Sequence, residues 1–133
     1  YDNIKAKKVD RVVMCSGKVF YELLTRRQDD QINNVAILRL EQLYPFPREL
    51  LKSELAKYPN SKELIWCQEE PINQGAWYTS RHNFMQCTPE NQTLDVVARD
   101  LYSAPAEGSV RQHNLNQNYV IEQALGLQPV KQR

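Results

Sequence analysis

The sequence is poor in cysteine, has no long hydrophobic run and carries almost no net charge. Its three cysteines, Cys15, Cys67 and Cys87, are odd in number and widely spaced, which excludes a disulfide framework and a zinc knuckle. Apolar runs stop at about seven residues, whereas a helix that spans a bilayer needs about 20. The formal net charge of +1 gives no bulk attraction to nucleic acid or to an anionic membrane. These shortages indicate a globular domain of a reducing compartment, with neither nucleic acid nor membrane as its partner.

Four short apolar runs alternate with segments of helical periodicity. The runs at 12–15, 35–40, 63–68 and 94–99 are predicted to be strands buried on both faces. Helices are expected at 18–27, 47–58, 77–85 and 112–125. The alternation predicts an α/β fold of three layers, with a mainly parallel sheet of about five strands and helices on both faces. The fifth strand would be an edge strand from a segment that the pattern does not assign.

The ends of the chain differ from its middle in composition. Residues 1–9 are basic and polar and are expected to be a linker, whereas 10–126 hold the patterned segments and form the domain. Residues 127–133 are expected to be a disordered tail. Because the chain starts with Tyr1, we interpret it as a piece of a longer protein.

Basic residues gather near the predicted carboxyl ends of the strands, which is where ligands bind in parallel α/β sheets. Residues 16–18 form a turn that opens a helix, so its free backbone N–H groups could hold a phosphate. Arg39 ends the next strand, on the same side of the sheet in a right-handed strand-helix-strand unit. The turn lacks the glycine spacing of a nucleotide loop, and a plain helix start remains the alternative. The candidate effector site consists of Ser16, Gly17, Lys18, Arg26, Arg39 and Arg99.

The stretch CQEEPINQGAWY at 67–78 places two adjacent carboxylates, Glu69 and Glu70, before a proline and a glycine turn. A general acid and base is one interpretation of the pair. Adjacent residues of an extended strand point to opposite faces, however, so they do not converge on one substrate atom. We therefore expect a structural corner or interface, in which Glu70 accepts hydrogen bonds from turn N–H groups or from an arginine. Its members are Glu69, Glu70, Asn73, Gln74, Gly75 and Trp77.

The residues alone predict no catalytic, cofactor-binding or metal-ligating set. His82 and His113 are far apart in the sequence, and neither has a cysteine or an acid at ligand spacing. No serine, histidine and acid arrangement is visible either. Composition and pattern therefore indicate an α/β domain without chemistry of its own.

Four stretches carry a resemblance to a known family: SGKVFYELLTRR, RLEQLYPFP, WCQEEPINQGAW and SAPAEGSVRQH. They resemble the C-terminal domain of the thiamine-diphosphate-dependent decarboxylating subunit of 2-oxoglutarate dehydrogenase, a transketolase-like family. The resemblance covers about residues 10–126 and is weakest between 81 and 95, where a polar loop departs from the family pattern. It implies a transketolase C-terminal-domain-like fold.

The resemblance also implies what the complete subunit does. That subunit would bind thiamine diphosphate with Mg²⁺, decarboxylate 2-oxoglutarate in the citric acid cycle and pass the succinyl group to the lipoyl group of a succinyltransferase component. It would act as a homodimer within a multienzyme complex. The cofactor would be held by two preceding domains, so this chain is expected to be inactive alone and to serve structure, assembly or regulation.

The family leaves one functional alternative open. Some of its members carry an acyl-CoA regulatory site in this domain, so the chain could be a stand-alone binding module for a phosphate-bearing effector such as acetyl-CoA or AMP. The motifs favour a bacterial cytoplasm as its compartment, with a mitochondrial matrix as the alternative.

Overall fold

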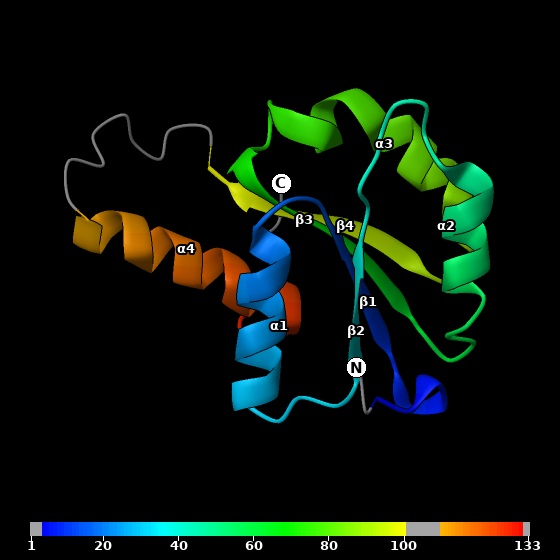
Figure 1. The fold of residues 1–133 in the computed structure, drawn as a ribbon, viewed down its shortest axis with the longest axis horizontal. Coiled ribbons are helices and arrows are strands. Elements are labelled where there is room, and N and C mark those ends of the chain that lie inside the picture. The colour runs from blue at the N-terminus through cyan, green and yellow to red at the C-terminus, as the bar shows by residue number, and fades with distance from the viewer. Residues whose placement is uncertain (1–3, 101–109, 132–133) are drawn as a thin grey trace.

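The computed structural model describes residues 4–100 and 110–131, in which strands and helices alternate along the chain (Figure 1). The strands are β1 (Arg11–Cys15), β2 (Val35–Arg39), β3 (Glu63–Pro71) and β4 (Thr93–Arg99). The α-helices are α1 (Val19–Asp29), α2 (Arg48–Leu55), α3 (Gly75–Cys87) and α4 (Val110–Leu125), and a short 3-10 helix, η1, covers Ala6–Lys8. No helix of these segments is long and apolar enough to cross a membrane.

The strands form one parallel sheet in the order β2-β1-β3-β4. Val13 in β1 lies opposite Ile37 of β2 and Ile65 of β3, which fixes the register at the centre of the sheet. The parallel α/β architecture is confirmed. The described residues contain four strands, so the expected fifth is not found among them. The unassigned segment after β2 carries Pro45 and Pro47, which have no N–H to donate to a neighbouring strand.

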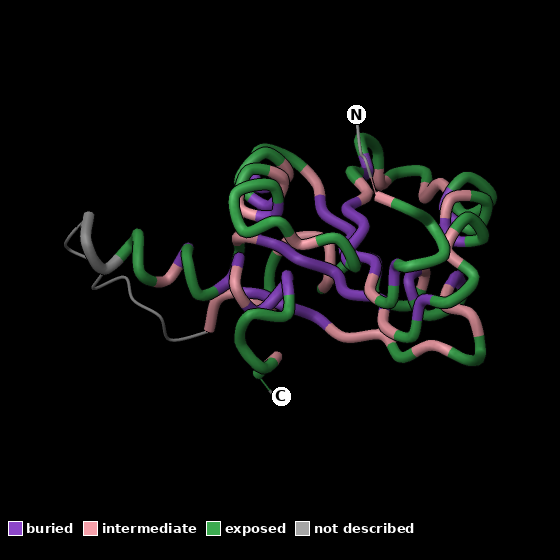
Figure 2. The backbone as a smooth tube through the Cα atoms, turned by 90° about the horizontal axis from the view of Figure 1, so that it is seen from below, coloured by how far each residue is buried: buried purple, intermediate pink, exposed green. Residues whose placement is uncertain are grey.

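Side chains that alternate along each strand pack into two separate core clusters. One cluster, around Met14 and Trp66, lies under α2 and α3. The other, around Cys15 and Ile65, lies under α1 and α4. Figure 2 shows the buried strands between helices whose outer surfaces are exposed. The three predicted layers are therefore confirmed, and both faces of the sheet are covered.

The second helix is shorter than its sequence pattern predicts. Pro47 is the residue before α2, not its first helical residue, and the helix ends at Leu55. Leu51 and Leu55 are buried, whereas Leu50 is 60% exposed. Leu51 and Leu55 are four residues apart and share one helix face, whereas Leu50 lies about a quarter-turn away from Leu51.

Both ends of the described chain pack on the domain. Val9 is fully buried and Ile4 packs against the same cluster, so the described part of the predicted linker, residues 4–9, contributes to the core. Val130 packs against the second cluster, and the backbone N–H of Lys131 donates to Gln123 Oε1 at 2.9 Å. The stretch 127–131, expected to be a disordered tail, is thus held by an apolar contact and a hydrogen bond.

Candidate functional site

The carboxyl ends of β1 and β2 bring residues 16–18 close to Arg39, as the sequence predicts. Cys15 is in register with Arg39, and the N–H of Leu40 donates to Cys15 O at 2.8 Å. Gly17 has φ +78°, a left-handed conformation that favours glycine, and Lys18 is exposed at the start of α1. The turn and the arginine are therefore neighbours.

The guanidinium of Arg39 is engaged by the first turn of α1. Its Nη1 donates to Tyr21 Oη at 3.0 Å, and its Cζ lies 5.1 Å from the Tyr21 ring centroid and 5.7 Å from that of Phe20. Such stacking on aromatic faces is a stable arrangement for arginine. An anion at the α1 start would compete with these contacts, and the effector site at this place stays a prediction.

The other two candidate cations lie elsewhere. Arg26 is in the last turns of α1, about eight residues and roughly 12 Å along the helix from Lys18. It pairs with Asp30 at 2.9 Å and with Glu122 at 3.0 Å. Arg99 ends β4, at the opposite edge of the sheet from β2, and donates to Gln117 Oε1 at 2.7 Å. The structure therefore does not bring the six candidate residues together into one site.

The predicted acidic corner is organised by Gln68, which sequence reasoning missed. This side chain is 3% exposed at the end of the apolar part of β3. Its Oε1 accepts from Trp66 Nε1 at 2.9 Å and from the backbone N–H of Trp77 at 3.0 Å. Its Nε2 donates to the carbonyls of Glu70 (3.2 Å), Pro71 (2.9 Å) and Gln74 (2.8 Å). One amide thus joins the strand, the turn and the first turn of α3.

The contact with Trp77 caps α3 from a distance. Gln74, the residue before the helix, makes no side-chain cap, so Gln68 satisfies an N–H of the first turn in its place. Gly75 has φ +68°, and a Cβ at that position would lie 3.2 Å from Gln68 Oε1. Glycine is therefore required here both by backbone conformation and by the nearness of the amide.

The two acids of the corner have different environments. Glu69 is half-buried and accepts from Gln117 Nε2 at 2.9 Å. Glu70 is exposed, and its carboxylate has no partner among the described residues. The expected hydrogen bonds to Glu70 are therefore not found, because the Gln68 amide, which points into the corner, has taken that role. Asn73 and Gln74 are exposed in the turn.

Gln117 on α4 forms a second polar junction that the sequence did not reveal. It is 8% exposed and lies between α1, β3 and β4. Its Nε2 donates to Glu69 at 2.9 Å and to Glu22 at 3.0 Å, while its Oε1 accepts from Arg99. The junction thus ties α4 to α1 and to the sheet through two carboxylates and one guanidinium.

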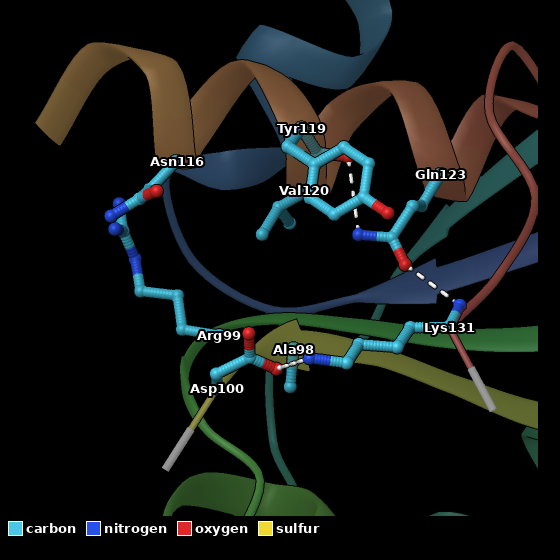
Figure 3. Close-up of a pocket in the computed structure, with 8 residues that line it drawn as sticks. All are labelled: Ala98, Arg99, Asp100, Asn116, Tyr119, Val120, Gln123 and Lys131. Carbon is cyan, nitrogen blue, oxygen red and sulfur yellow. Dashed lines mark hydrogen bonds and ion pairs between the residues drawn. The ribbon is translucent and has the colours of Figure 1, made fainter. Parts of the chain in front are cut away.

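A small cavity lies beside this junction, between β4, α4 and the C-terminal segment (Figure 3). Its volume of about 30 Å³ is room for one or two water molecules. Figure 3 shows Asp100 and Lys131 paired at its rim, with their charged atoms 2.8 Å apart. The cavity is far too small for an organic cofactor.

The donor set of the described residues does not fit a magnesium diphosphate. Mg²⁺ requires an octahedron of oxygen ligands. No three His, Cys, Asp or Glu side chains gather at a possible metal site in the described segments. We therefore derive no catalytic step through thiamine diphosphate in this chain.

The three cysteines are buried thiols within the core clusters. Burial raises the pKa of Cys15 to about 12, although the nearby positive charge of Arg39 acts in the opposite direction. Burial also raises the pKa of Cys67, with smaller contributions from Cys15 and Glu69. At neutral pH these thiols are protonated and thus poor nucleophiles.

The sheet order and the arrangement of helices define a transketolase-like α/β domain. Among solved structures, the chain is similar to one described as a split-gene transketolase in an inactive β4 tetramer, with a TM-score of 0.59. That match has 15% sequence identity and covers 89% of this chain and 39% of the transketolase chain. At such identity the likeness shows the fold alone.

Sequence comparison then shows the family. The family described as "2-oxoglutarate dehydrogenase C-terminal" matches residues 2–125, and the chain belongs to this family. The 2-oxoglutarate dehydrogenase E1 component of Coxiella burnetii is 50% identical over 90% of this chain, and that of Haemophilus influenzae is 48% identical over 93%. The chain spans 13% of the length of each of these relatives. The comparisons give no support to a stand-alone effector module.

Proposed function

We propose that this chain is the structural and assembly domain at the carboxyl end of an E1-type subunit of 2-oxoglutarate dehydrogenase. The observation that carries the proposal is the family match over residues 2–125. It is accompanied by a sequence identity of up to 50% to E1 components. The polar corners around Gln68 and Gln117 support it. Their hydrogen bonds fix strand ends to helices, which is the role of a rigid scaffold.

The reaction then belongs to the complete subunit. That subunit decarboxylates 2-oxoglutarate and transfers the succinyl group to a lipoyl group of the succinyltransferase component. Thiamine diphosphate and Mg²⁺ supply the carbanion chemistry when bound by the preceding domains. The subunit acts as a homodimer in the bacterial cytoplasm, with the mitochondrial matrix as the alternative compartment. This domain binds neither thiamine diphosphate nor Mg²⁺ and contributes to dimer assembly.

The test compares three purified proteins: the complete subunit, the subunit without this domain, and this chain alone. We measure 2-oxoglutarate-dependent dye reduction and sedimentation of each. The complete subunit should reduce the dye and sediment as a dimer, and removal of the domain should abolish the dimer. Dye reduction by this chain alone, or an intact dimer without it, would refute the proposal.

A further inference from the structure

Tyr44 stands out from the surface between β2 and α2. It is 92% exposed, more than any other large hydrophobic side chain of the described segments. Tyr78 on α3 is 71% exposed. Aromatic side chains that become buried in protein interfaces contribute strongly to the binding energy. A solvent-exposed aromatic side chain is therefore a candidate contact for another polypeptide.

The backbone that presents Tyr44 is fixed on both sides. Gln42 Nε2 donates to Tyr44 O at 2.9 Å. Phe46 packs edge-on against Phe84 of the core, with ring centroids 5.2 Å apart. Arg48 Nη2 then donates to Asn83 Oδ1 of α3 at 2.6 Å. Because the segment is already ordered, it loses little conformational entropy when a partner covers Tyr44.

A groove of about 530 Å³ runs between this segment and α3. One wall is apolar and is formed by Leu43, Tyr44, Pro45 and Phe46. The other wall is polar, with Thr79, His82 and Asn83 of α3. An apolar wall opposite hydrogen-bonding groups suits a polypeptide segment that offers an apolar side chain together with its backbone N–H and C=O groups.

We propose that this groove is the docking surface for a polypeptide segment from the part of the E1-type subunit that lies outside this chain. The inference rests on the proposed function. This chain spans only 13% of the length of its E1 relatives, so most of the surface available to contact it belongs to the same subunit. Contacts between domains of one chain commonly bury about 600–1,500 Å², an area that a groove of this kind would anchor.

The test is hydroxyl-radical labelling of the complete subunit and of this chain alone, read out by mass spectrometry. Tyr44 should be labelled readily in the chain alone. In the complete subunit its labelling should be lost, down to the level of Trp66, which is 1% exposed. The protection should not depend on subunit concentration, because the covering segment belongs to the same polypeptide.

Substitutions give a second, independent readout. Tyr44→Ser should leave the thermal midpoint of the chain alone unchanged, because the side chain is 92% exposed there, and should lower the midpoint of the complete subunit. Leu50→Ser is the matched control: Leu50 is 60% exposed on α2, does not line the groove, and should leave both midpoints unchanged.

Equal labelling of Tyr44 in both proteins would overturn the inference, even if the subunit assembles and reacts as proposed above. Protection that disappears on dilution would show that another molecule covers the groove, and would also overturn it. A Tyr44→Ser effect in the chain alone would mean that the side chain stabilises the domain itself, which contradicts the docking role.

Discussion

Replacing the buried Gln68 by methionine should destabilise the fold more than most single changes at the carboxyl-terminal end of β3. Methionine keeps the length of the side chain and adds no branching, so the change removes hydrogen bonds with little loss of volume. The Gln68 amide makes five hydrogen bonds of 2.8 to 3.2 Å, and every one of them is lost.

The magnitude follows from the groups left behind. The indole N–H of Trp66, in a side chain 1% exposed, and the N–H of Trp77 lose their acceptor. Each stranded donor costs about 1–3 kcal/mol, so the two together should lower the free energy of unfolding by about 2–6 kcal/mol. The carbonyls of Glu70 and Gln74 belong to exposed residues and can be hydrated, so we add nothing for them.

Urea unfolding of the chain, followed by tryptophan fluorescence, measures the effect. With a slope of about 2 kcal/mol per molar urea, the midpoint should fall by roughly 1–3 M. Glu70→Ala is the matched control from the same corner. The Glu70 carboxylate is exposed and has no partner among the described residues, so the change should stay within about 0.5 kcal/mol. A stable Gln68→Met variant together with a destabilised Glu70→Ala variant would refute our assignment of the corner.

Three further predictions concern the backbone at Gly75, the carboxyl-terminal end of α4 and the thiol of Cys15. Gly75→Ala should cost more than about 1 kcal/mol by urea unfolding, because φ is +68° and the new Cβ meets Gln68 Oε1; Gly17→Ala, with open space around the Cβ, should cost less. Arg11→Lys should lower stability by about 1–3 kcal/mol in the same assay, because Arg11 Nη1 donates to the last-turn carbonyls of Gln123 and Ala124 at 3.0 and 3.1 Å, a geometry that lysine does not reproduce. The pKa of Cys15 is raised by burial to about 12, so the folded state holds its proton more tightly than the unfolded state does. Stability should therefore be unaffected by this thiol below about pH 9 and fall between about pH 9 and 12, with a shallower fall in Cys15→Ala; identical pH curves would contradict the burial argument.

The strands were the most predictable part of the fold. Runs such as VVMC and LIWC are apolar at every position because both faces of a central parallel strand are buried. Helix boundaries were less predictable, since α3 starts at Gly75, where a distant glutamine caps it, and not at Trp77. That capping contact is tertiary and leaves no local pattern.

The burial of Gln68 and Gln117 did leave a faint signal in the sequence. Leu64, Trp66 and Gln68 alternate onto one face of β3, so Gln68 occupies a core position of the strand. Gln117 precedes Val120, Ile121 and Ala124 by three, four and seven residues, which places it on the buried face of α4. A polar residue in phase with a core stripe predicts a satisfied buried group, but not which partners satisfy it.

The candidate effector residues show a different limit of prediction from sequence. Strand order places Arg39 and Arg99 on opposite edges of the sheet, and a helix length separates Lys18 from Arg26. The sequence order of the strands does not reveal that β1 lies between β2 and β3, so nearness at one edge could be predicted only for the first two strands. Their predicted adjacency is present, but aromatic stacking engages the arginine.

Neutral amides, and not the conspicuous acids, occupy the buried positions at the carboxyl end of this sheet. Burying a carboxylate costs far more than burying an amide that makes all its hydrogen bonds. An amide also donates and accepts at once, so Gln68 can join N–H groups to carbonyls, which an ionised carboxylate cannot do. Glu69 remains half-buried and Glu70 remains exposed, so their charges stay hydrated. No buried side-chain nitrogen or oxygen of the described residues lacks a hydrogen-bond partner, and a network satisfied in this way resists rearrangement. Rigid, internally bonded corners of this kind suit a domain that positions its neighbours within a larger subunit.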